Sequence, residues 1–200
     1  DIAPVDGLRF GLLGSYTHGS LSIPARASSA KITSYSLGAY GGASMGHVQL
    51  RFGGNYAWNS LRTTRGVAFS GFSDRLTARY NGSTAQAFGD VGYTIGTTRT
   101  HIEPFAQAAW IDVATDPFTE QGGAAAVTAR KRSQAITLTM LGLRGAVGFS
   151  LGSIAANVHA TAGWRHASGD TAPTASLAFA GGNSFLIAGL PIAKDSATLD

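Results

Sequence analysis

Two carboxylates, Asp90 and Glu103, are the side chains whose type and spacing could support chemistry. They fall on the polar faces of two alternating segments that follow one another along the chain, so folding can bring them together. Paired carboxylates can share a proton and act as acid and base. Arginines on similar polar faces, Arg51, Arg144 and Arg165, offer a second interpretation, in which ion pairs hold a polar interior together. We favour the ion pairs.

The other candidates for chemistry do not form a site. The histidines are dispersed, and His159 and His166 are seven positions apart, which places them on opposite faces of one strand. There is no G-x-S-x-G sequence to present a nucleophilic serine. No helix is expected after the glycines at 11–14 or 41–42, so these glycines do not predict a phosphate-binding loop. We therefore predict no enzyme activity, no metal and no cofactor.

The elements that position Asp90 and Glu103 are expected to be β-strands. Between Val48 and Asn59 the side chains alternate with a period of two, which is typical of a strand with one apolar and one polar face. The apolar set is Val48, Leu50, Phe52, Tyr56 and Trp58, and the polar set is Gln49, Arg51, Asn55 and Asn59. The same pattern predicts strands over residues 8–18, 32–43, 48–59, 75–94, 101–115, 135–149 and 155–167.

Two breaks in the alternation predict irregularities. Leu76, Ala78 and Tyr80 are out of phase with the apolar positions that follow from Ala85 onward, which suggests a β-bulge near Asn81. A second change of phase falls between Met140 and Leu141.

The composition favours a membrane. Charged residues make up 13% of the 200 residues and hydrophobic ones 44%, so a soluble globule of this composition would be poorly solvated. The most apolar stretch, 135–158, contains Arg144 and several glycines and is no spanning helix. The remaining way to satisfy the backbone in lipid is a closed β-barrel. Scattered arginines without a basic run give no sign of nucleic-acid binding, and the absence of cysteine excludes disulfides.

The spacing of the predicted strands and aromatics fits such a barrel. Long and short gaps alternate between the strands, as long external loops and short periplasmic turns do in outer-membrane barrels. Tyr16, Trp58, Trp110 and Trp164 each lie near the end of a strand that leads into a long gap, so we expect them to form one aromatic girdle at the membrane interface.

The polar alternate positions are then expected to face a water-filled lumen. Placing Arg51 on the lipid side instead would cost about 2–4 kcal/mol at the midplane. The predicted lumen-facing residues are Arg51, Asn55, Asp90, Glu103, Gln107 and Arg165.

Several short motifs, in this order, resemble the C-terminal translocator barrel of type V autotransporters. They are 88–93 (FGDVGY), 102–106 (IEPFA), 118–122 (FTEQG), 141–144 (LGLR), 163–166 (GWRH) and 185–193 (FLIAGLPIA). Asp90 stands where this family often has glutamate.

The resemblance implies an all-β, up-and-down antiparallel transmembrane β-barrel of twelve strands in the outer membrane of a Gram-negative bacterium. It implies a barrel that anchors an N-terminal passenger and helps export it. The expected partners are outer-membrane lipid, the passenger segment upstream and the barrel-assembly machinery. In some members of the family, lumenal acidic side chains cut the passenger inside the barrel.

Residues 1–200 are expected to form a single domain that is an internal fragment of this barrel. Only about seven strands and the start of an eighth are predicted, and the family's opening and closing strands are absent. Two alternatives remain at this point: a small porin or adhesin-like barrel without a passenger, and a secreted β-sandwich used for binding.

Overall fold

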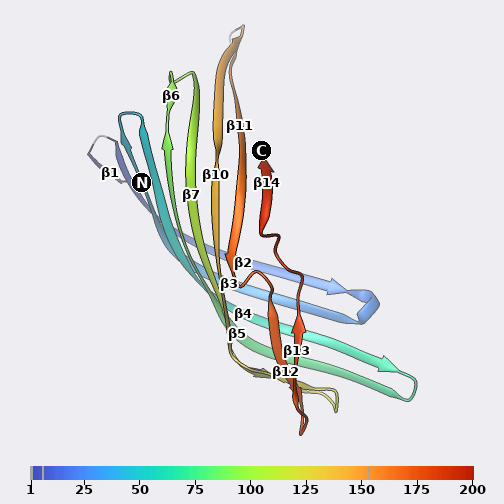
Figure 1. Ribbon diagram of the computed structural model, residues 1–200. Helices are drawn as coiled ribbons and strands as arrows, with labels where there is room; N and C mark the ends of the chain where they lie inside the picture. The colour runs from blue at the N-terminus through green and yellow to red at the C-terminus, as the bar shows by residue number, and fades with distance from the viewer. Residues whose placement is uncertain (1, 6, 153) are drawn as a thin grey trace.

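The computed structural model describes residues 2–5, 7–152 and 154–200, and most of them lie in one antiparallel β-sheet (Figure 1). Neighbouring strands in this sheet follow one another along the chain, with the order β1-β2-β3-β4-β5-β7-β10-β11-β14 and β6 paired to β7. The strands are β1 (Ile2–Val5), β2 (Leu8–Ile23), β3 (Ser28–Met45), β4 (Val48–Phe69), β5 (Phe72–Tyr93), β6 (Ile95–Gly96), β7 (Thr100–Thr115), β10 (Arg132–Leu151), β11 (Ile154–Gly169) and β14 (Asp195–Leu199). The predicted all-β, up-and-down antiparallel fold is confirmed.

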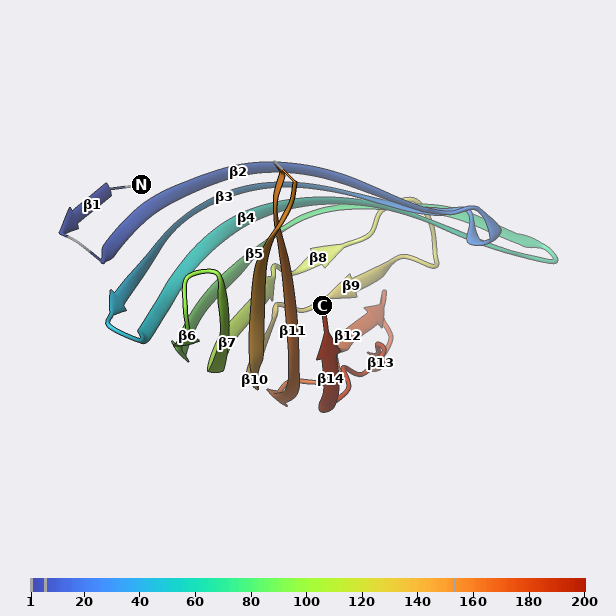
Figure 2. The same ribbon diagram turned by 90° about the horizontal axis from the view of Figure 1, so that it is seen from above.

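A second, four-stranded sheet forms from two connections that are far apart in the sequence. The connection between β7 and β10, residues 116–131, supplies β8 (Phe118–Thr119) and β9 (Val127–Ala129) and is called the β8–β9 connection below. The connection after β11 supplies β12 (Thr174–Phe179) and β13 (Ser184–Ala188). Its order is β13-β12-β9-β8. Figure 2 shows that the main sheet is curved and that this small sheet lies on its concave side.

Seven predicted strands are present, but two of the predicted long loops are wrong. Residues 19–23, 28–31, 60–69 and 72–74, which fall in the predicted gaps, continue the strands. The β2–β3 hairpin closes through a short 3₁₀ turn, η1 (Pro24–Arg26), and the β4–β5 hairpin turns at Gly71, whose φ of 80° suits glycine. These segments look like loops in the sequence because they lack the regular alternation of the predicted strands, yet their backbones remain paired in the hairpins.

The two hairpins project beyond the rest of the sheet (Figure 1). β4 has 22 residues, whereas a tilted strand needs only about 9–11 to cross a membrane. β5 pairs with β7 only from Gly82 onward, so its first ten residues, 72–81, extend past this neighbour.

The predicted bulge near Asn81 is also wrong. The β4–β5 register is continuous from Phe69↔Phe72 to Val48↔Tyr93. The apolar residues change face because their surroundings change. Leu76 and Ala78 lie on the concave face of the projecting hairpin, where the β8–β9 connection covers them, and they are 0% and 4% exposed. The second predicted irregularity, between Met140 and Leu141 on β10, is absent too, because β10 pairs without a shift with both of its neighbours, β7 and β11.

The register assigns the two faces of the main sheet. Arg65 on β4 pairs with Glu120, which lies between β8 and β9 and therefore on the concave side. Arg51 is an even number of positions from Arg65 on the same strand, so it shares the concave face, and Leu50 and Phe52 lie on the convex face. In the described part of the chain, no helix is long and apolar enough to span a membrane.

Candidate functional site

Four charged side chains form an ion-paired cluster on the concave face. Arg51 and Asp90 are direct cross-strand neighbours on β4 and β5, and Glu103 and Arg144 are direct neighbours on β7 and β10. Because the strands alternate sides regularly, one register brings residues from four strands to the same place. The cluster contains two guanidiniums and two carboxylates, so its formal charges cancel.

Each guanidinium in the cluster contacts both carboxylates. Arg51 Nη1 donates to Asp90 Oδ1 at 2.6 Å and to Glu103 Oε1 at 2.9 Å. Arg144 Nη2 donates to Asp90 Oδ2 at 2.5 Å, and Arg144 Nη1 donates to Glu103 Oε1 at 2.8 Å. The carboxylate side chains are only 2% and 5% exposed, while the arginines remain partly exposed. The two acids are thus joined to arginines, which is the ion-pair interpretation and not a proton-sharing pair.

Two uncharged residues shape the cluster. The Arg144 guanidinium lies 3.7 Å from the centre of the Phe105 ring, a cation–π contact that holds the side chain flat. Gly92 leaves room for Glu103, because a Cβ at position 92 would stand 2.6 Å from Glu103 Cδ. Sequence reasoning did not give Phe105 this role, although its place on the polar face was a signal.

The other predicted lumen-facing residues share the concave face but not the cluster. Gln107 is the direct cross-strand neighbour of Asp90. Asn55 lies four positions along β4 from Arg51, and Arg165 donates from Nε to Ser196 Oγ at 3.2 Å. A cavity of about 210 Å³ beside the cluster is lined by residues that include His101 and His159. Among the described residues, no group of three or more histidines and acids could hold a metal ion.

The predicted girdle residues all lie on the convex face and are exposed. Tyr16, Tyr35 and Trp58 are direct cross-strand neighbours in one row on β2, β3 and β4. The exposed fractions are 61% for Tyr16 and 51% for Trp58, values that decide against a packed interior. Trp110 and Trp164 are 43% and 49% exposed, and by register each is displaced along the strands from this row.

A second ion pair fastens the β8–β9 connection to the projecting hairpin. Arg65 donates from Nε and Nη2 to the two carboxylate oxygens of Glu120, at 3.1 and 2.5 Å, and from Nη2 to the Ala125 carbonyl at 2.9 Å. The hydrogen bond to Glu120 raises the pKa of Arg65 above its ordinary value. Glu120 also accepts from the Val127 backbone N–H.

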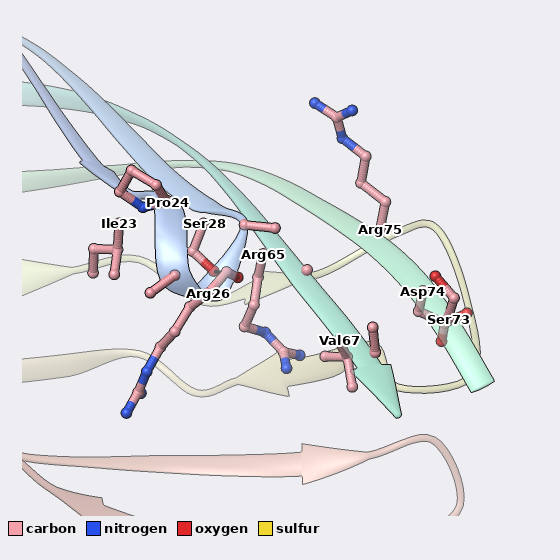
Figure 3. A pocket seen from close by; sticks show the side chains of 13 residues that line it. Ile23, Pro24, Arg26, Ser28, Arg65, Val67, Ser73, Asp74 and Arg75 are labelled. Carbon is pink, nitrogen blue, oxygen red and sulfur yellow. Dashed lines mark hydrogen bonds between the residues drawn. The ribbon is translucent and has the colours of Figure 1, made fainter. Parts of the chain in front are cut away.

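An open groove of about 1040 Å³ lies beside this ion pair, between the tips of the two projecting hairpins. Figure 3 shows Arg65 pointing toward the β8–β9 side and Arg75 pointing away from it. The two arginines therefore mark opposite faces of the same hairpin.

An antiparallel up-and-down sheet with exposed aromatic and aliphatic side chains on its convex face and a neutralised polar cluster on its concave face has the features of an outer-membrane β-barrel protein. Comparison with known proteins gives the particular family. Residues 1–200 match the family model described as the autotransporter beta-domain, and the chain belongs to this family.

Relatives and a solved structure agree with this assignment. The chain is 35% identical over 192 residues to one extracellular serine protease of Serratia marcescens and 33% identical over 195 residues to another. It covers 18% and 19% of these two proteins, and 96% and 97% of the chain is matched. The translocator domain of the autotransporter NalP from Neisseria meningitidis has the same fold, with a TM-score of 0.69 at 17% identity over 97% of this chain and 73% of that one.

The domain is thus an outer-membrane translocator of a Gram-negative bacterium, which anchors a passenger and helps export it. This confirms the function implied by the sequence resemblance. It also decides against the small porin and the secreted β-sandwich.

Proposed function

We propose that the concave face of the main sheet lines the path along which the passenger segment crosses the membrane, and that the convex face contacts outer-membrane lipid. The observation that carries this proposal is the segregation of charge. Four charged side chains from four strands neutralise one another on the concave face, while the apolar side chains of β4 alternate onto the convex face.

The cluster suits a structural role in the wall of that path. Each carboxylate is hydrogen-bonded by two guanidiniums, an arrangement that favours a structural role for the acids over proton transfer. Neutral charge also lets a passing segment move without being held by one sign of field. We therefore propose that the domain works without chemistry of its own, and that the barrel-assembly machinery inserts it.

The passenger is proposed to lie upstream of this domain and to be a secreted hydrolase. The support is that both relatives are extracellular serine proteases and that this chain matches less than a fifth of each. Secreted protease activity that is lost when the β-domain is deleted, and that a serine-directed inhibitor abolishes, would establish this. A passenger secreted equally well without the domain would contradict it.

Paired nitroxide labels test the two faces in the full-length protein in outer membranes. The chain has no cysteine, so single cysteines can be placed at Gln107 on the concave face and at the adjacent Ala108 on the convex face. We expect Gln107→Cys to be accessible to a water-soluble relaxation agent and Ala108→Cys to oxygen dissolved in lipid. Equal accessibility of both labels to the aqueous agent would refute the assignment.

A further inference from the structure

A row of three cations crosses the convex face of the projecting hairpins. Lys31 on β3 is the direct cross-strand neighbour of Arg62 on β4, and Arg62 is the direct neighbour of Arg79 on β5. All three side chains are exposed. The alternation that places Leu50 and Trp58 on the convex face places Arg62 there too, since all are at even positions of β4.

This basic row (Lys31, Arg62 and Arg79) is electrostatically uncompensated. The ion pairs in the described part of the chain join other arginines and one histidine to acids, and none includes a member of the row. Like charges directly opposite one another in a sheet are destabilising. A fold that keeps three of them side by side is therefore suited to an anionic ligand that bridges them.

The position of the row relative to the aromatic row points to the ligand. Lys31 is four residues beyond Tyr35 on β3, and Arg62 is four residues beyond Trp58 on β4. Four residues of a strand span about 13 Å. Aromatic side chains of this kind occupy the interface between hydrocarbon and headgroups. The basic row therefore lies one step farther from the hydrocarbon, at the level of charged headgroups.

The long hairpins identify the side of the membrane. In outer-membrane barrels, the short turns between strands face the periplasm and the longer loops face the cell exterior. On this sheet, β3 and β4 connect tightly, whereas the β2–β3 and β4–β5 hairpins project. The row is on the projecting part, which belongs to the external leaflet.

The immediate surroundings of the row offer space and further donors. A groove of about 450 Å³ is lined by Lys31, Arg62 and Arg79 together with His18, Thr33 and Ser60. Guanidinium and ammonium groups are the side chains that bind phosphate best, and hydroxyls add hydrogen bonds.

We propose that the basic row binds the phosphate groups of an anionic glycolipid of the outer leaflet and so fixes the height of the domain in the membrane. The proposal relies on the outer-membrane location of the domain and is independent of the path taken by the passenger. Export can therefore be measured separately.

The test compares matched variants of the full-length protein, purified in non-ionic detergent, for binding of fluorescent lipid A in mixed micelles. The triple variant Lys31→Gln, Arg62→Gln, Arg79→Gln should lose about 100-fold in affinity, which is about 3 kcal/mol for three charges near an anionic surface. A control triple variant that removes the same charge from exposed sites elsewhere, Arg130→Gln, Lys131→Gln and Lys194→Gln, should bind like the wild type.

Four further measurements identify the ligand and guard against misfolding. Dephosphorylated lipid A should bind no better to the wild type than to the triple variant. Inorganic phosphate at the same phosphate concentration should not displace the lipid. Variants that keep the charge, Arg62→Lys and Arg79→Lys, should retain most of the affinity. Should the triple variant lack the heat-modifiable gel mobility of a folded barrel, the single Arg62→Gln change should still weaken binding about fivefold.

Several results would overturn the proposal. They are lipid A binding that is unchanged in the folded triple variant, equal loss in the control variant, or full displacement by inorganic phosphate. Unchanged lipid binding combined with release of the passenger from the cell surface would assign the row to a protein partner instead.

Discussion

At the scale of single residues, the tightest constraint in the ion-paired cluster is the space left by Gly92. Gly92 lies directly across the sheet from Phe105, which is the next residue after Glu103 on the concave face of β7. The Glu103 carboxylate occupies the volume that a Cβ at position 92 would take. Crowding a packed site by one methyl group costs about 1–3 kcal/mol.

Gly92→Ala should therefore lower the temperature at which the full-length protein loses its compact gel mobility. Gly89→Ala is the matched control, because a Cβ at position 89 on the same strand meets no atom within 4 Å. Equal shifts for the two variants would show that Gly92 does not make room for Glu103.

Arg144 offers a second residue-scale prediction. Arg144→Gln leaves two nearly buried carboxylates with one guanidinium, and also removes the contact with the Phe105 ring. Breaking a fully buried pair costs about 3–5 kcal/mol, and we expect about 1–3 kcal/mol because Arg144 is partly exposed. Urea denaturation in lipid vesicles measures this loss. Arg165→Gln, which gives up one exposed hydrogen bond to Ser196, should change stability by less than about 0.5 kcal/mol.

Part of this site was predictable and part was not. The alternation of Gln49, Arg51 and Asn55 predicted which residues share a face, because a strand has a period of two. It could not predict that Arg51 and Arg144 would contact Asp90 and that Arg165 would not contact it, because contact depends on the register between strands. Register is set by long-range pairing, of which one sequence carries little trace.

At the scale of elements, the β4–β5 hairpin shows why the strand ends were predicted too short. Its outer half mixes exposed polar and apolar side chains, and it carries buried or half-buried apolar side chains at Leu76, Ala78 and Tyr80, where the β8–β9 connection covers it. A change in alternation thus reports a change of surroundings along one uninterrupted strand. In the sequence alone, this change cannot be distinguished from the change of phase that a β-bulge produces.

Tyr80 provides a pH prediction for this hairpin. Burial raises its pKa above the ordinary value of 10.0, and the negative charge of Glu120 adds to the shift. Because the pKa of Tyr80 is raised in the folded protein, burial of its neutral side chain stabilises the fold fully below pH 10. This contribution to the free energy of unfolding is lost as the pH rises through the raised pKa. Tyrosinate absorbance at 295 nm, taken as wild type minus Tyr80→Phe, should show a titration above pH 10.

Removing the Glu120 charge should shift this titration to lower pH. Glu120→Gln is the variant, and Asp116→Asn is a control that removes one charge from the same connection. A Tyr80 titration that coincides with that of a free tyrosine would contradict the packing of the β8–β9 connection onto the hairpin.

Across the whole molecule, adjacent positions on a strand need side chains of opposite polarity, because one faces the concave side of the sheet and the next faces the convex side. Gln86 and Ala87 are adjacent on β5 and both are exposed, but by register Gln86 is on the concave face and Ala87 on the convex face. An arginine facing lipid near the midplane costs about 2–4 kcal/mol.

Ala87→Arg should therefore reduce the amount of folded barrel in the outer membrane much more than Gln86→Arg. Quantitative gel analysis of heated and unheated outer-membrane fractions measures the difference. Equal yields of the two variants, or a larger loss for Gln86→Arg, would contradict the assignment of the faces.

The membrane location could be inferred from the sequence because composition and strand alternation are properties of the whole chain. The family followed from the order of several short motifs, each of them weak alone. The small sheet of β8, β9, β12 and β13 was not predicted, because its strands have as few as two residues and their pairing depends on two connections meeting in space.

The unbroken register of the β4–β5 hairpin has a mechanical consequence. Its strands have 22 residues each, or about 70 Å of continuously paired backbone, with no bulge that could act as a joint. A molecule that binds the tip near Phe69 and Phe72 is therefore held at a fixed distance from the bilayer. A cell-surface molecule that meets this protein would therefore encounter a fixed spacing, and shortening the hairpin would bring it closer in steps of about 3.3 Å per residue pair.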